Sequence, residues 1–371
     1  MPDFHEAVSS LTAELPRTEL AHMIRTVRAL DRLSRSQAYR RLIDLALPET
    51  ARFNPGHDSV MMGYDFHLSS EGIKLIEVNT NAGGGLLSFL AHVPHSVLAH
   101  LDLPHRLESQ LLRSFAEEKG SFQGIGSSQP RHIAIIDEFP EEQFLYPEMK
   151  AFAELFRNWG SEVVIADPSE LEAGHQGVNH NGRPIDLIYN RHCDFYLESE
   201  AMSGIRAAYL AGAVCLTPNP FTYGLLADKR RMVLWSDADL LSRLGPAEKA
   251  CELLTKIVPE SHLLCDMERD SLWKDRKRWV FKPVSRFGSR GVLLGKKISR
   301  RRFDELDPED TLVQRLAEPS VTGANTDMPM KTDFRLYAYR HNILGVAARL
   351  YQGQVTNMRT AGGGFAPVRL V

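Results

Sequence analysis

Apolar positions at the start of the chain recur with the spacing of an amphipathic helix. Between residues 17 and 48, apolar residues such as Leu20, Met23 and Val27 return at intervals of three or four, which predicts helix. The many arginines of this segment are interpreted as a solvated helical face, with a ligand-binding role as the alternative. Residues 1–50 carry no motif that we can assign.

The pattern then changes to two short runs of aliphatic and aromatic residues. They flank a Ser-Ser-Glu-Gly turn at residues 69–72, so they predict a β-hairpin over residues 61–80. A run of glycines at residues 83–85 follows, and a helix is expected from Leu86 onward.

From residue 132 onward, continuous apolar runs alternate with helical segments. Strands are expected at residues 132–137, 162–167, 185–191 and 213–216, and helices at residues 146–159 and 199–211. This alternation predicts a small parallel sheet covered by helices, a Rossmann-like arrangement. A dinucleotide-binding site is not predicted, because no G-x-G-x-x-G follows the first two runs.

Strand patterns predominate in the last third of the chain. Strands are expected at residues 279–283, 292–294 and 311–316, and an antiparallel meander at residues 333–339, 343–351 and 354–358. Together with the middle segment, this predicts an α/β protein with added antiparallel sheet (α+β).

Composition narrows the function classes. The chain has 371 residues, 43% of them hydrophobic, and a net charge of −3, which gives no electrostatic reason to expect nucleic acid or an anionic membrane as partner. The four cysteines form no C-x-x-C pair and are interpreted as thiols, with disulfides as the alternative. No secretory signal or long apolar run is visible, so a cytoplasmic protein is expected.

The hairpin carries the first candidate chemistry. Glu77 and Asn79 are two residues apart on one strand, so their side chains leave the same face. Asp65, on the partner strand, reaches that face if the register places it opposite. Two carboxylates and an amide oxygen suit Mg²⁺, which is often coordinated by protein oxygens and substrate phosphates together. The alternative is a half-exposed hairpin whose acids are solvated.

A second candidate feature is the Ser-, Gly- and Arg-rich loop at residues 284–291, which Lys282 precedes. Loop amides and hydroxyls can bind phosphate oxygens while the lysine supplies a charge. The loop is not a Walker A motif. The alternative to a phosphate-binding loop is a glycine-rich hairpin loop that binds no ligand. Separately, Arg191 ends a strand of the parallel sheet, where it would bind a substrate carboxylate or form a plain salt bridge.

Taken in order, these features resemble the ATP-grasp superfamily. The resemblance rests on Lys229, on Phe281-Lys282-Pro283 with its glycine loop, on residues 312–318, on Asp333-Phe334-Arg335, and on the hairpin of Asp65, Glu77 and Asn79. Because the hairpin precedes the lysines, the chain is similar to circularly permuted members, the eukaryotic glutathione-synthetase-like and glutathionylspermidine-synthetase-like group. One departure is that residues 284–287 lack the metal-binding glutamate of eukaryotic glutathione synthetase.

The resemblance implies a permuted ATP-grasp fold in three parts. Residues 1–95 would hold the N-terminal helices and the magnesium hairpin and pack with the C-terminal lobe. Residues 96–225 would form the Rossmann-like pre-ATP-grasp domain, and residues 226–371 the ATP-grasp lobes.

The resemblance also implies an ADP-forming carboxylate–amine ligase that uses ATP and Mg²⁺ and forms an acyl phosphate. The roles it implies are metal binding by Asp65, Glu77 and Asn79; nucleotide binding by Lys229, Lys282, Ser285, Gly288, Ser289, Gly291, Gln314, Leu316 and Glu318; catalysis by Arg335 and Arg349; and substrate binding by Arg191, Asn357 and Gly363.

Two other functions stay open. The first is a protein that binds Mg-ATP without ligase activity, and the second is a phosphotransferase to a hydroxyl. The expected partners are small-molecule carboxylate and amine (or peptide) substrates, with no nucleic acid and no membrane. The oligomeric state is open, with a homodimer as the candidate.

Overall fold

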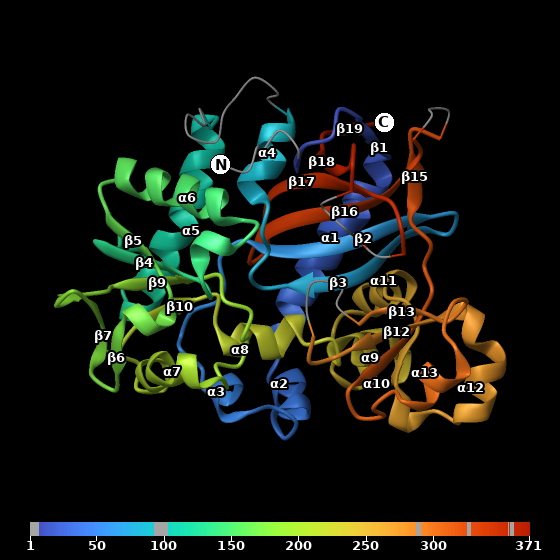
Figure 1. Ribbon diagram of the computed structural model, residues 1–371. Helices are drawn as coiled ribbons and strands as arrows, with labels where there is room; N and C mark the ends of the chain where they lie inside the picture. Colours follow the sequence, from blue (N-terminus) through green and yellow to red (C-terminus); the bar gives the residue numbers. More distant parts are fainter. Residues whose placement is uncertain (1–6, 93–102, 287–290, 325–327, 355, 357–359) are drawn as a thin grey trace.

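The computed structural model describes residues 7–92, 103–286, 291–324, 328–354, 356 and 360–371. It is a mixed α/β structure with both parallel and antiparallel sheets (Figure 1), which confirms the predicted class at this level. None of the described helices has the length and apolar content that crossing a membrane requires.

The N-terminal helical region is broken into separate helices. A single segment over residues 17–48 was expected, but α1 (Arg17–Ser34) ends before Ser36, whose hydroxyl accepts a hydrogen bond from Tyr39 N at 3.5 Å. A serine in this N-cap position favours a new helix start over continuation. The next helices are α2 (Gln37–Asp44) and α3 (Glu49–Arg52).

The largest sheet is antiparallel and joins the two ends of the sequence. The predicted hairpin is present as β2 (Met62–Ser69) and β3 (Gly72–Asn79), and β2 pairs with β16 (Met330–Tyr339) near the other end of the chain (Figure 1). The remaining strands continue outward as β17 (Asn342–Tyr351) and β18 (Gly364–Ala366), and β15 (Ser320–Thr322) pairs with β16.

We call these strands the central sheet. Beside it, β1 (Ala13–Leu15) pairs in parallel with β19 (Val368–Leu370). Beyond β17 the sheet continues with β18, which pairs with β17. A third meander strand was expected at residues 354–358, and of that segment residues 355, 357 and 358 lie outside the described part of the chain.

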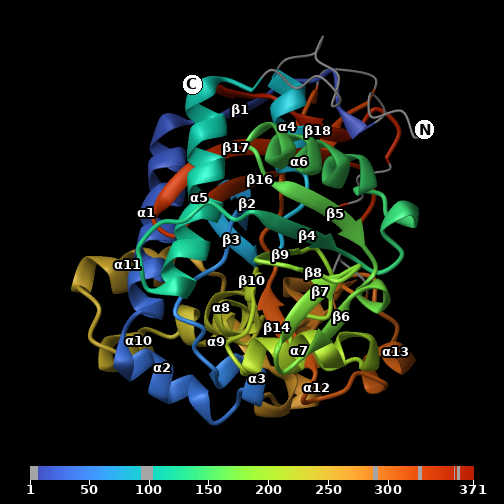
Figure 2. The same cartoon turned by 90° about the vertical axis from the view of Figure 1, so that its left-hand side faces the viewer.

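The predicted parallel sheet is present, with strand order β10-β9-β4-β5. Its strands are β4 (His132–Ile136), β5 (Glu162–Ala166), β9 (Leu187–Asn190) and β10 (Cys215–Thr217). Helices α5 (His105–Gln123), α6 (Tyr146–Asn158) and α7 (Ser203–Leu210) accompany it (Figure 2). The sequence did not predict the small antiparallel sheet of β6 (Glu172–Gly174), β7 (Gly177–His180) and β8 (Arg183–Pro184), because those residues lack an apolar alternation.

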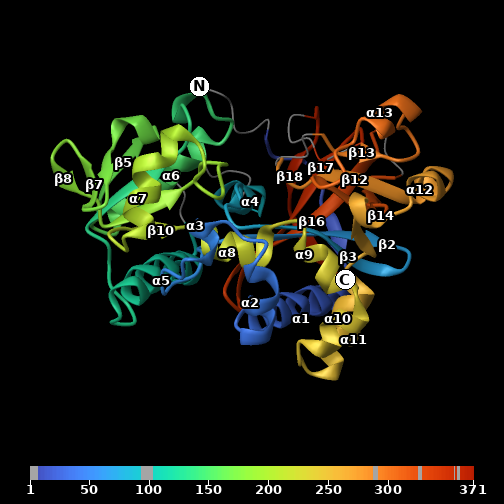
Figure 3. The ribbon, with the colours of Figure 1, turned by 90° about the horizontal axis from the view of Figure 1, so that it is seen from below.

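A third sheet has the order β11-β14-β12-β13 and its own apolar core, which includes Leu272, Phe281 and Phe303. Its strands are β11 (Ser261–Leu263), β12 (Trp279–Pro283), β13 (Leu293–Leu294) and β14 (Thr311–Arg315), and its helices are α12 (Arg269–Asp275) and α13 (Arg300–Asp304). Figure 3 shows this sheet on one side of the central sheet and the parallel sheet on the other.

The remaining helices connect or cover these sheets. Two large apolar clusters lie against the central sheet: one includes residues of α1, and the other reaches the parallel sheet. The connecting helices are α4 (Gly85–His92), α8 (Pro220–Thr222), the π-helix η6 (Tyr223–Ala227), α9 (Arg231–Ser236), α10 (Ala238–Arg243) and α11 (Glu248–Ile257).

Candidate functional site

A cavity of about 540 Å³ is lined by all three main sheets and their loops. The central sheet supplies residues from the hairpin and from β16 and β17, the third sheet supplies β12 and β14, and the parallel sheet supplies the ends of β4 and β9. Its charged lining residues are Asp65, Glu77, Asp137, Arg191, Lys229, Lys282, Arg286, Arg315, Asp333, Arg335 and Arg349.

The hairpin register places Asp65 directly opposite Glu77, and Gly63 opposite Asn79. Asp65 also lies opposite Arg335 of β16. Because residues that face one another across a ladder share a face, the three hairpin side chains and Arg335 reach the same side of the central sheet. All of the hairpin residues that the sequence singled out therefore lie in one place.

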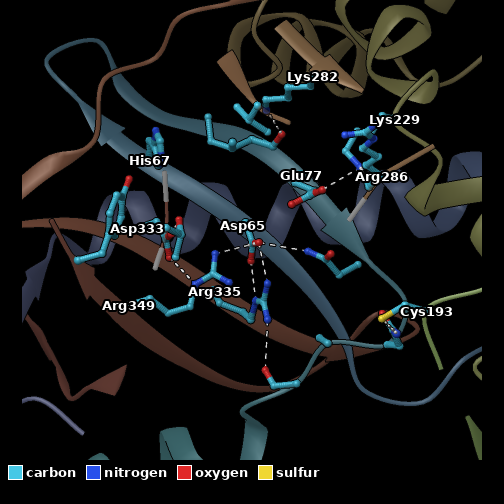
Figure 4. A pocket seen from close by; sticks show the side chains of 18 of the residues that line it. Asp65, His67, Glu77, Cys193, Lys229, Lys282, Arg286, Asp333, Arg335 and Arg349 are labelled. Atoms are coloured by element: carbon cyan, nitrogen blue, oxygen red, sulfur yellow. Dashed lines mark hydrogen bonds and ion pairs between the residues drawn. The ribbon is translucent and has the colours of Figure 1, made fainter. Parts of the chain in front are cut away.

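Asp65 is held by arginines in this structure. Arg335 donates to its carboxylate from Nε at 2.6 Å and from Nη2 at 2.7 Å, and Arg349 Nη2 lies 2.9 Å from Oδ2 (Figure 4). Asn79 Nδ2 donates to the same oxygen at 3.1 Å. Burial alone would raise the pKa of Asp65, but the two guanidinium groups outweigh burial and lower that pKa to about 2.

A second carboxylate extends this arrangement along the sheet. Arg349 Nε donates to Asp333 Oδ1 at 2.6 Å, and Thr356 Oγ1 donates to Oδ2 at 2.7 Å. On the other side, Arg335 Nη1 donates to Gly83 O at 3.2 Å. Asp65, Asp333, Arg335 and Arg349 thus form an alternating row of charges, which we call the arginine row.

The two candidate lysines come from different segments of the chain, and both line the cavity. Lys282 Nζ, on β12, donates to Gln314 Oε1 at 2.6 Å and to Ile76 O at 3.0 Å. No carboxylate of the described residues lies within 4.0 Å of this ammonium group. Its burial, only partly offset by the more distant Glu77, lowers the pKa of Lys282 to about 8.

Lys229 follows the π-helix η6 and approaches the hairpin. Its Nζ donates to Arg286 O at 2.7 Å and lies 3.3 Å from Glu77 Oε1 (Figure 4). Lys229 is therefore the cation beside the candidate metal ligand Glu77. An ammonium group in this position can bind a phosphate once it separates from the carboxylate.

Two of the three hairpin residues predicted to bind magnesium are placed to do so. Glu77 and Asn79 offer a carboxylate and an amide oxygen on one face, which are ligand types that Mg²⁺ prefers. Asp65 does not fit as a direct ligand in this arrangement, because both of its oxygens accept hydrogen bonds from arginine. No group of three or more His, Cys, Asp or Glu side chains is placed to hold a metal within the described residues.

The part of the cavity bordered by β12, β13 and β14 has an apolar lining. Gln314 and Leu316 lie there with Ile76, Val280 and Leu294, a combination that suits a planar base.

The sequence did not single out His67, which borders the same part of the cavity. Its Nδ1 lies 2.7 Å from Ala317 O, and burial lowers the pKa of the imidazole. Since a carbonyl only accepts, the ring donates from Nδ1. His67 therefore fixes the chain directly after β14.

Another part of the cavity lies at the carboxyl edge of the parallel sheet. Arg191 is buried, donates from Nη1 to Asn81 O at 2.9 Å, and lies over the Tyr189 ring. Asp137 and Cys193 line the cavity beside it. The sequence had singled out Arg191 but not Asp137, although Asp137 also directly follows a strand of that sheet.

Several predicted residues do not line the cavity. Ser285 donates from N and Oγ to Asp310 at 2.8 and 2.7 Å, and Glu318 is exposed and pairs with Lys296 at 3.0 Å. Gly291 has a φ of 77° and packs on Pro283, and Gly363 packs against Leu350 O. Gly288, Ser289 and Asn357 lie outside the described residues.

Comparisons with known proteins identify related structures. No protein-family model matches the chain, and a search of curated proteins found no match. Among solved structures, a glutathione synthetase-like effector from Globodera pallida, in its apo form, has a TM-score of 0.63 at 11% identity, with 98% of this chain and 90% of that chain covered.

A second solved structure agrees. A protein from Methylobacillus flagellatus, provisionally described as a γ-glutamylcysteine synthetase, has a TM-score of 0.53 at 11% identity, with 95% and 87% covered. At this identity the likeness concerns the fold alone. The chain has a fold similar to the folds of these two solved structures.

Proposed function

We propose that this protein is an ATP-dependent ligase that joins a carboxylate to an amine and releases ADP and phosphate. We further propose that it does so on a circularly permuted ATP-grasp fold, because the hairpin strands precede the two lysines in the sequence but pair with β16 near its end. The names of the two structural neighbours, both synthetases or synthetase-like, agree with this reaction class.

The observation that carries the proposal is the convergence of charged groups on one cavity. Lys229, Lys282, Arg335, Arg349 and Glu77 come from five different elements or connections, yet all line it. Four of these groups are cations, and a triphosphate is the ligand that needs such a number. Phosphoryl transfer depends on this kind of positioning and charge neutralisation more than on a protein nucleophile.

The residues take the following roles in the proposal. Lys229 and Lys282 hold the α- and β-phosphates, and Gln314 and Leu316 border the base. A substrate carboxylate oxygen attacks the γ-phosphorus, which forms an acyl phosphate and releases ADP. The amine nitrogen then attacks the acyl carbon, and inorganic phosphate leaves. Arg335 and Arg349 stabilise the transferred phosphoryl group, while Arg191 binds the carboxylate substrate.

Magnesium would be held by Glu77 and Asn79, with Asp65 as a further ligand only if it separates from its arginines. When bound, the ion would neutralise charge on the β- and γ-phosphate oxygens. The chain's own contribution is to keep the carboxylate and amide oxygens on one face of the hairpin and opposite the arginine row.

Binding of Mg-ATP by isothermal titration is the first test, and hydroxamate trapping is the second. The wild-type protein is expected to bind Mg-ATP and, with a panel of carboxylic acids, to form hydroxamate when hydroxylamine intercepts the acyl phosphate. Binding with acid-independent turnover and no hydroxamate would indicate a nucleotide-binding protein without ligase activity. Phosphate ester formation without hydroxamate would indicate the phosphotransferase, and absence of Mg-ATP binding would contradict all three functions.

A further inference from the structure

The carboxylate of Asp137 stands apart from the other acids of the cavity. Asp137 directly follows β4, is 9% exposed and lines the cavity. Glu138 N donates to its Oδ1 at 2.9 Å, and no described residue donates to its Oδ2. A carboxylate has about four acceptor sites, so most of its hydrogen-bonding capacity is left for a ligand.

Every other acidic side chain that lines the cavity has a cation beside it. Asp65 lies 2.6 Å from Arg335, Asp333 lies 2.6 Å from Arg349, and Glu77 lies 3.3 Å from Lys229. Asp137 has no lysine, arginine or histidine nitrogen within 4.0 Å in the part of the chain that the structure describes. A buried carboxylate without a cation is unfavourable, and burial raises the pKa of Asp137 to about 6.

Arg191 is the nearby cation of the protein, but it does not pair with Asp137. It lines the same end of the cavity and acts on Asp137 through space, but its Nη1 is used by Asn81 O at 2.9 Å. The two opposite charges are therefore near each other without forming an ion pair. A cationic group at Asp137 and a carboxylate at Arg191 would each meet an opposite charge.

This end of the cavity is joined to the arginine row by a short segment. Gly83 O accepts from Arg335 Nη1 at 3.2 Å, and a Cβ on Gly83 would lie 2.8 Å from Arg191 Nη2 and 2.2 Å from Leu145 Cδ1. The segment is thus packed between the two arginines and the loop that starts at Asp137. A substrate group held at Asp137 lies in the same cavity as the proposed reacting groups.

We infer that Asp137 selects the nucleophile of the reaction by binding its primary ammonium group, beside the carboxylate site at Arg191. Because an ammonium nitrogen has no lone pair, it first gives one proton to the Asp137 carboxylate. The neutral amine nitrogen then attacks the acyl carbon, the bond to phosphate breaks, and the second proton leaves with the phosphate. This inference rests on the proposed ligase function and deepens it, because it names a cationic amine as the acceptor. A hydroxyl acceptor could donate one hydrogen bond to Asp137 but would leave the buried charge uncompensated, so the residue distinguishes an amine from a hydroxyl.

The test uses two small probes that differ in this one group. Glycinamide carries an ammonium group, and glycolamide has a neutral hydroxyl in its place. Their affinities for the full-length protein are measured by NMR titration, with and without saturating Mg-ADP. The wild type is expected to bind glycinamide about tenfold or more tightly than glycolamide.

The variants are Asp137→Asn and, as a matched control, Glu138→Gln, which removes a neighbouring exposed carboxylate. Asp137→Asn is expected to lose the preference for glycinamide while it binds Mg-ADP as the wild type does, which also shows that it is folded. Glu138→Gln is expected to keep both properties.

Equal affinities of the wild type for the two probes, no binding of glycinamide by the wild type, or an unchanged preference in Asp137→Asn would each overturn the inference. Failure of the proposed function is a separate result. If the wild type binds neither Mg-ATP nor Mg-ADP, the ligase proposal fails, and the glycinamide titration of the protein alone still decides whether Asp137 binds an ammonium group.

Discussion

The cations on the two sides of the cavity are stabilised in different ways. In the arginine row, Arg335 and Arg349 lie against the carboxylates of Asp65 and Asp333, with N···O distances of 2.6 Å. On the third sheet, Lys282 lies against a neutral amide and a backbone carbonyl. The first side is balanced by the protein, whereas the second retains an uncompensated positive charge that an anion would stabilise.

Before any ligand binds, the charged groups on the two sides of the cavity therefore affect the stability of the protein in different ways. Four buried charged groups that pair with each other across β2, β16 and β17 hold the central sheet in register. A buried ammonium without a carboxylate costs stability, and in the proposed function this cost is offset when Lys282 binds a phosphate. The predictions that follow test this contrast, from the largest expected effect to the smallest.

The largest effect is expected from Asp65→Asn, which removes the charge shared by two buried arginines. Leaving those guanidinium groups without their common partner should lower the free energy of unfolding by about 3 kcal/mol or more. The measurement is urea unfolding followed by circular dichroism. Asp333→Asn is the control. Arg349 would still pair with Asp65 in this variant, so the free energy of unfolding should fall by less than in Asp65→Asn. Equal losses below about 1 kcal/mol in both variants would contradict a stabilising arginine row.

The opposite outcome is expected for Lys282→Met. Because its ammonium group is buried without a carboxylate, the variant should unfold at the same or higher urea concentration than the wild type. Its affinity for Mg-ATP should fall by roughly 10- to 100-fold, the loss expected for charged hydrogen bonds. Isothermal titration measures this fall. Lys296→Met, which removes an exposed lysine paired with Glu318, should leave the affinity unchanged, and an equal loss there would argue against a specific role of Lys282.

The pH dependence of stability sharpens the same contrast. The pKa of Lys282 is lowered from 10.5 to about 8 in the folded protein, so between these values the unfolded chain binds more protons than the folded one. The free energy of unfolding therefore gains a positive slope with pH from about 8 to 10.5. The difference in unfolding free energy between wild type and Lys282→Met should rise across that window. A flat difference would mean that the lysine is not destabilised by burial.

The sequence predicted the two sides to different extents. The spacing along the second hairpin strand placed Glu77 and Asn79 on one face. Asp65 reaches that face only because a register shift between Asp65 and Phe66 brings it opposite Glu77, and the sequence did not predict that shift. It could not show that Arg335 would hold Asp65, since those residues are 270 positions apart and meet only through the pairing of β16 with β2. The prediction of Asp65 as a metal ligand was made without that competitor.

The parallel sheet illustrates the same limit. Its buried apolar strands were predictable from continuous hydrophobic runs, and so was the position of Arg191 at a strand end. The importance of Asp137 was not, because an acid at the end of a strand is common and only the three-dimensional partners distinguish it. His67 was missed for a similar reason: its contact with Ala317 O spans 250 positions in the chain.

The smallest effect is expected from Glu77→Gln, which releases Lys229 from its carboxylate. In the proposed function Lys229 binds a phosphate, so metal-free ATP competes with the Glu77 carboxylate for its ammonium group. The variant should bind metal-free ATP about two- to fivefold more tightly, the range of a partly exposed ion pair. The variant should also lose most of the increase in ATP affinity that magnesium gives to the wild type. Isothermal titration with and without EDTA measures both, and Glu71→Gln in the hairpin turn is the control. Weaker binding of metal-free ATP by Glu77→Gln would show that Glu77 orients Lys229 for the phosphate rather than competing with it.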